Sequence, residues 1–84
     1  MSEYSIENIK RISDECLRLV YGGFDSKKND TLRRRVFSIS LSTFPYNRQA
    51  ENCLKEVKEE VRNAKYSPLN CHFLLEEIIR LVSY

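Results

Sequence analysis

Apolar residues near the carboxyl end recur at steps of three and four, which is the spacing of one face of an α-helix. The members of this face are Cys71, Leu74, Leu75, Ile78, Ile79 and Val82. Phe73 and Leu81 widen the face beyond an ordinary amphipathic stripe. Ser67 is a preferred N-cap residue and Pro68 suits a first helical turn, so the pattern predicts a helix over 68–83. A helix that is apolar over so much of its circumference is usually covered on more than one side, so we expect it to be the central helix of the fold.

A second amphipathic pattern covers residues 4–21. Its apolar side consists of Ile6, Ile9, Ile12, Cys16, Leu19 and Val20, and charged residues fill the opposite side. Gly22 and Gly23 follow directly, and glycine readily adopts the left-handed conformation that ends many helices. The pattern therefore predicts a helix over 4–21 that ends at this pair of glycines.

A narrower apolar stripe runs along residues 47–64, where almost all other positions are charged. The stripe consists of Ala50, Cys53, Leu54, Val57, Val61 and Ala64. This pattern is typical of an outer helix that packs along one edge. Only Lys65, Tyr66 and Ser67 separate it from the last predicted helix. We therefore expect the two helices to form an antiparallel hairpin.

The segment 31–43 supports two interpretations. Phe37, Ile39 and Leu41 alternate with Ser38, Ser40 and Ser42, as in a half-buried strand. Leu32, Val36, Ile39 and Thr43 would equally share one face of a helix. No other stretch offers a partner strand, and a lone strand cannot satisfy its own backbone groups unless two copies of the chain pair with each other. We therefore predict a helix over 31–43, with Asp30 as its N-cap and 24–30 as a polar connector.

These four segments predict an all-α fold, a small antiparallel bundle of three to four helices in a single domain over 1–84. The hydrophobic fraction of 42% and the charged fraction of 31% are those of a globular protein. No run approaches the roughly 20 apolar residues that cross a bilayer, and no secretory signal pattern opens the chain. We therefore expect a cytoplasmic protein. Because a domain this small buries a modest core, we expect either a tight monomer or a symmetric homodimer.

The residue types that carry enzyme chemistry are few. Cys16, Cys53 and Cys71 fall at apolar helical positions and are odd in number, so we expect reduced and mainly buried thiols. His72 is the only histidine, and its neighbour Cys71 points about 100° away from it on a helix. The chain contains no C-x-x-C, H-E-x-x-H or glycine-rich phosphate loop. We therefore expect no catalytic residues, no metal site and no cofactor.

Positive charge concentrates in one short block, although the net charge of the chain is only +2. The block contains Lys27, Lys28, Arg33, Arg34 and Arg35, and Asp30 is the one acidic residue among them. Such a block can contact nucleic-acid phosphates, anionic lipid headgroups or an acidic protein surface. It can equally be the solvated start of a helix, since three consecutive arginines splay around the helix axis.

The predicted hairpin also resembles a known family. Leu54, Val57, Val61 and the Lys65–Tyr66 pair, followed after a proline-containing turn by Leu74, Leu75, Ile78, Ile79 and Val82, are similar in pattern to the class IIa (enterocin/pediocin-type) bacteriocin immunity proteins. The resemblance covers mainly residues 50–84. It implies a cytosolic antiparallel four-helix bundle without catalytic residues. Such a protein protects its cell from a pore-forming peptide by acting on the peptide-bound sugar-transporter receptor.

We therefore expect a non-enzymatic immunity or interaction protein that acts from the cytosolic side through a helical surface. The alternative is a small nucleic-acid-associated or phage regulatory module that uses the basic block 27–35. The residues expected to contact a partner are Lys27, Lys28, Arg33, Arg34, Arg35, Phe73, Leu81 and Tyr84. The main expected partner is a protein such as a toxin-bound membrane receptor. Peripheral contact with an anionic membrane surface would accompany it, and nucleic acid comes second.

Overall fold

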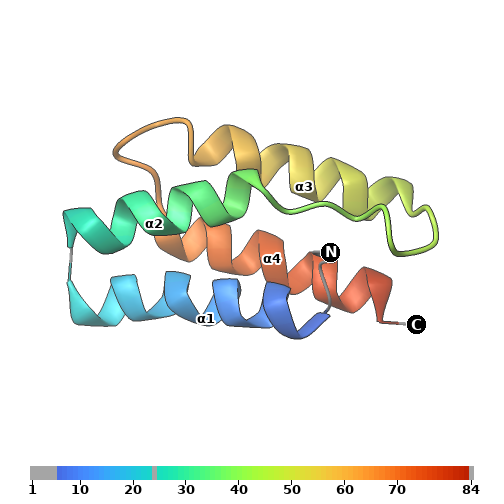
Figure 1. The fold of residues 1–84 in the computed structure, drawn as a ribbon, viewed down its shortest axis with the longest axis horizontal. Coiled ribbons are helices and arrows are strands. Elements are labelled where there is room, and N and C mark those ends of the chain that lie inside the picture. Colours follow the sequence, from blue (N-terminus) through green and yellow to red (C-terminus); the bar gives the residue numbers. More distant parts are fainter. Residues whose placement is uncertain (1–5, 24, 84) are drawn as a thin grey trace.

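Four α-helices make up most of the residues that the computed structural model describes, which are 6–23 and 25–83. They are α1 (Ile6–Gly22), α2 (Ser26–Phe37), α3 (Arg48–Glu60) and α4 (Pro68–Val82). Each helix runs antiparallel to the one before it (Figure 1). Both α2 and α4 pack against α1 and α3, so the helices form an up–down–up–down bundle. The described residues contain no strand, and the all-α prediction is confirmed.

The first helix agrees with the predicted range as far as the structure describes it, because residues 4 and 5 lie outside the described part. Gly23 has a φ of +86°, a left-handed conformation that residues with a side chain rarely adopt. The glycine therefore ends α1 as the sequence predicts, and it leads the chain into α2 within a few residues.

The predicted helix over 31–43 is wrong at both ends, because α2 spans Ser26–Phe37. Asp25, rather than Asp30, is the N-cap: its side chain accepts a hydrogen bond from the backbone N–H of Lys28 at 3.1 Å. The sequence predicts a connector here because residues 26–30 carry no apolar side chain. A capped first turn is nevertheless sufficient to start the helix inside that polar stretch.

After α2 the chain is extended rather than helical. The Ser38 N–H closes the helix on the Arg34 carbonyl at 3.1 Å. Ile39 and Leu41 are then 1% and 6% exposed, and the three serines that alternate with them are exposed. The alternating pattern thus reports an extended segment with one buried side. That side closes the hydrophobic core instead of joining a sheet.

The third helix is shorter than the predicted 47–64. Asn47 is its N-cap and accepts the Ala50 N–H at 3.0 Å, and Val61 is its C-cap. The link to α4 consists of residues 61–67 instead of the three predicted, because the chain continues after Glu60 in tight turns. The antiparallel arrangement of α3 and α4 is as predicted (Figure 1).

The last helix matches its predicted range of 68–83 to within one residue, and Ser67 caps it by accepting the Asn70 N–H at 3.1 Å. α4 packs against α1 on one side and α3 on the other, which confirms its central place. Its buried residues are Cys71, Leu75, Ile78 and Ile79. Phe73, which the sequence assigns to the widened apolar face, is instead 60% exposed.

Side chains from all four helices meet in one core, to which Ile39, Leu41, Val61 and Tyr66 of the connecting segments add. Cys16 and Cys71 are buried as predicted, and Cys53 is half-buried. Within residues 6–23 and 25–83, no helix combines the length and the hydropathy that a membrane span requires.

Candidate functional site

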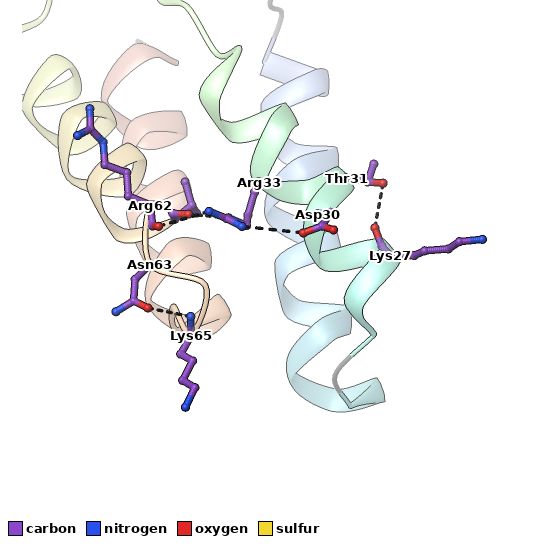
Figure 2. Close-up of polar contacts among 8 residues, drawn as sticks. Lys27, Asp30, Thr31, Arg33, Arg62, Asn63 and Lys65 are labelled. Carbon is purple, nitrogen blue, oxygen red and sulfur yellow. Dashed lines mark hydrogen bonds and ion pairs between the residues drawn. The ribbon is translucent and has the colours of Figure 1, made fainter.

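The basic block does not form one surface, because Arg33 is used inside the fold. Its Nε donates a hydrogen bond to the Val61 carbonyl at 2.8 Å, and Nη2 donates to the Arg62 carbonyl at 3.3 Å (Figure 2). Nη1 lies 3.9 Å from the Asp30 carboxylate. The Val61 carbonyl belongs to the C-cap of α3, so the guanidinium lies at the negative end of that helix dipole and ties α3 to α2.

Of the other four residues of the block, one is also engaged within the fold and three are exposed. Arg35 forms an ion pair with Glu15 and thereby joins α2 to α1. Lys27, Lys28 and Arg34 are exposed, and their side chains form no ion pair or hydrogen bond with the described residues. Two of the five predicted residues therefore stabilise helix packing, and three remain open to a partner.

A groove of about 450 Å³ lies between the end of α1 and the start of α2, and Lys27 and Lys28 line part of it. Its other lining residues include both acidic and basic side chains. Arg35 on its wall is already paired with Glu15. Because the charges along this groove partly neutralise one another, it does not form a strong anion site.

A polar contact joins α1 to α4 in the otherwise apolar packing. His72 Nδ1 lies 3.0 Å from the Ser13 carbonyl oxygen and 2.8 Å from its hydroxyl oxygen, and that hydroxyl lies 3.1 Å from Glu76 Oε2. A carbonyl only accepts hydrogen bonds, so Nδ1 carries the proton in this contact. The Ser13 hydroxyl is then left to donate to Glu76. These bonds satisfy a serine that is 0% exposed.

The three residue types are those of a hydrolytic triad, but their arrangement is different. In a triad the imidazole lies between the hydroxyl and the carboxylate, one ring nitrogen facing each. Here the carboxylate of Glu76 contacts Ser13, and Nδ1 of His72 faces Ser13 as well. Ser13 is also fully buried and closed to a substrate. The contact positions two helices relative to each other.

The thiols are shielded from the chemistry that requires a thiolate. Burial raises the pKa of the Cys16 thiol to about 12, with a smaller contribution from Glu15. Burial likewise raises the pKa of Cys71 to about 12 and also raises that of Cys53. Within the described residues, no three His, Cys, Asp or Glu side chains are grouped as a metal ion would require.

Tyr66 carries a buried hydroxyl that has no hydrogen-bond partner. Its pKa is raised, first by burial and then by the neighbouring Cys16 and Cys71. An unpaired buried hydroxyl costs folding free energy, so the hydroxyl offsets part of the stability that burial of the ring provides.

The residues predicted on the last helix are placed unequally. Phe73 is 60% exposed, with its ring centroid 5.6 Å from that of His72. Leu81 is half-buried against the core. Tyr84 lies outside the described residues. Leu69, one turn before Phe73, is 40% exposed and extends the apolar outer side of α4.

Sequence reasoning missed Ser13, Glu76 and Leu69. Ser13 interrupts the apolar side of α1 directly after Ile12, which is a signal for a buried polar contact. Leu69 stands four residues before Phe73, so the helical spacing already places both on one side.

No protein-family model, curated protein or solved structure matches this chain. The function is therefore inferred from the exposed residues of the chain itself.

Proposed function

We propose that this protein is non-enzymatic and acts by contact, as a bacteriocin immunity protein that binds its partner through a helical surface. The observation that carries the proposal is the pair Leu69 and Phe73, 40% and 60% exposed and one turn apart on α4. Full burial of such a side chain is worth about 1.5–3 kcal/mol, and that gain is left unused in the free protein. Adjacent apolar side chains held in water are typical of a surface that a partner covers.

The architecture supports the immunity role. The resemblance on residues 50–84 implies an antiparallel four-helix bundle, and the chain folds as an up–down–up–down bundle of four helices (Figure 1). The buried Ser13 and the shielded thiols favour contact over catalysis. In this role the protein acts from the cytosolic side on a membrane receptor that holds the pore-forming peptide.

The nucleic-acid alternative loses part of its basis. Arg33 and Arg35 are engaged in contacts between helices, so only Lys27, Lys28 and Arg34 of the block would face phosphates. The aromatic residue of α2, Phe37, comes after these three residues, so none lies between them as stacking on successive bases would require. We therefore do not propose it as the function.

The test is protection of a living cell. The chain is expressed in a sensitive lactic-acid bacterium, which is then challenged with a panel of pediocin-like peptides beside an empty-vector control. We expect the inhibitory concentration to rise for at least one peptide. Unchanged sensitivity to the whole panel, with folded protein detected in the cells, would contradict the proposal.

A further inference from the structure

One end of the bundle exposes apolar side chains that the fold does not use. At this end α1 passes into α2 and the α3–α4 connection lies beside them, on the left of Figure 1. We refer to the described residues 20–23, 25–30 and 61–69 as the loop end. Its exposed apolar residues are Val20, Tyr21 and Leu69, which are 38%, 82% and 40% exposed.

A recess of about 520 Å³ opens between Val20 and Leu69, whereas Tyr21 lies beside Lys28 on a neighbouring groove of the same end. Its lining residues come from the end of α1, the first part of α2, the α3–α4 connection and the start of α4. Its lining is mainly apolar, with Leu19, Val20, Ala64, Tyr66, Pro68 and Leu69. Asn29, which is 6% exposed, adds a polar group to the wall.

The charges at the loop end are unbalanced. Lys27, Lys28 and Lys65 are exposed, and their side chains form no hydrogen bond or ion pair within the described chain. Figure 2 shows Lys27 and Lys65 extending from two sides of this end. The loop end also contains Arg62, and its two acidic residues are Asp25, which caps α2, and Asp30, which faces Arg33. The basic residues outnumber the acidic ones, so the apolar side chains are bordered by a net positive charge.

We propose that the loop end docks on the surface of an anionic phospholipid membrane. Val20, Tyr21 and Leu69 enter the interface between headgroups and acyl chains, while the three lysines meet lipid phosphates. Apolar and aromatic side chains bordered by lysines are the combination that binds peripheral proteins to such surfaces. Nucleic acid fits less well, because phosphate contacts alone would leave the apolar side chains in water.

The opposite end of the bundle provides an internal contrast. Residues 38–47, which turn at that end in Figure 1, contain no lysine or arginine. Tyr46 in this segment is 79% exposed, almost as much as Tyr21. The two tyrosines are therefore almost equally exposed, and a probe at either position reports on its own end of the bundle.

The inference goes beyond the proposed function, since it concerns lipid and requires neither toxin nor receptor. Leu69 belongs to both surfaces, whereas Phe73 belongs only to the proposed partner surface and Tyr21 only to the loop end. A chain that fails to protect cells can still bind vesicles, and a protective chain can fail to bind them. The two experiments therefore fail independently.

The test uses the full chain with a single tryptophan as reporter, because the natural sequence contains none. Tyr21→Trp and Tyr46→Trp are titrated with vesicles of phosphatidylglycerol and phosphatidylcholine, and with vesicles of phosphatidylcholine alone. We expect a blue shift of the emission only for Tyr21→Trp and only with phosphatidylglycerol, weakened by added salt. Equal shifts at both ends, or no shift at low salt, would overturn the proposal.

A matched pair of charge variants completes the design. Lys27→Gln, Lys28→Gln and Lys65→Gln are combined in one chain, and Lys10→Gln, Arg48→Gln and Lys55→Gln in another with the same net charge. The first set should weaken vesicle binding about fivefold per lysine, and the second should change it little. Circular dichroism confirms that both chains fold. Equal losses in the two sets, or tighter binding to duplex DNA than to vesicles of equal phosphate content, would contradict membrane docking.

Discussion

Nε of Arg33 donates a hydrogen bond to the Val61 carbonyl at 2.8 Å, and through it α2 holds the end of α3. The arginine side chain is 27% exposed, so water only partly competes for this bond. A basic residue that looks like part of a binding surface in the sequence is thereby a structural element. Hydrogen bonds from a charged donor are stronger than those between neutral groups.

Arg33→Ala should lower the free energy of unfolding by about 1.5–3 kcal/mol, because it removes a charged donor from two backbone carbonyls. Arg34→Ala is the matched control, since it removes the same charge from the next position. We expect it to stay within about 0.5 kcal/mol of the natural protein. Urea denaturation measures both. Equal losses of stability in the two variants would show that the positive charge, and not the bond from Arg33 to the end of α3, stabilises the fold.

Tyr66→Phe removes the buried hydroxyl that has no partner. We expect the free energy of unfolding to stay the same or to rise by up to about 1–3 kcal/mol, since the cost of desolvating the hydroxyl is removed. Tyr46→Phe, at an exposed position, should change nothing. Thermal and urea unfolding provide the measurement. A clear loss of stability in Tyr66→Phe would mean that the hydroxyl has a partner in solution.

The contact between Ser13 and His72 should appear as coupling between α1 and α4. A double-mutant cycle with Ser13→Ala and His72→Ala should give an interaction energy of about 0.5–1.5 kcal/mol. Ser38→Ala paired with His72→Ala is the control, because Ser38 bonds within α2. Strictly additive losses of stability for Ser13→Ala and His72→Ala would show that the two side chains do not couple α1 to α4.

The buried thiols predict a loss of stability at alkaline pH. An unfolded cysteine titrates with a pKa near 8.5, whereas burial raises the pKa of Cys16 and Cys71 to about 12. The stabilising contribution is therefore full below the unfolded pKa. It falls as pH rises toward 12, because only the unfolded chain releases these protons in that range.

The test is the fall of the urea midpoint between about pH 8 and about pH 10. This fall should be shallower for the double variant Cys16→Ala/Cys71→Ala than for the natural chain. Cys53→Ala is the control, because Cys53 is only half-buried. Parallel slopes for the natural chain and the double variant would contradict the assignment.

The first and last helices, α1 and α4, could be predicted because their signals are local and repeated. The apolar steps from Cys71 to Val82, together with the Ser67 cap, define α4 almost to the residue. In contrast, α2 buries only Asn29, Leu32 and Val36, which is too short a stripe to locate its start. Asp25 caps this helix start by accepting the Lys28 N–H, but in the sequence it looks like any residue of a polar turn.

The candidate surfaces could be predicted only in part, because pairing across the fold selects among similar residues. Arg33, Arg34 and Arg35 look equivalent in the sequence. In the fold, Arg33 bonds to the Val61 carbonyl and Arg35 pairs with Glu15. Phe73 and Leu81 both widen one apolar face. In the fold Leu81 packs against the core, whereas Phe73 remains in water.

The contact role of α4 is tested most directly by the survival of peptide-challenged cells that carry Phe73→Asp or Tyr46→Asp. Both changes place a carboxylate at an exposed aromatic position, so neither should alter the thermal midpoint. We predict that the natural chain and Tyr46→Asp protect the cells, and that Phe73→Asp does not. Equal protection by Phe73→Asp, or no protection by the natural chain, would contradict a function exerted through this side of the helix.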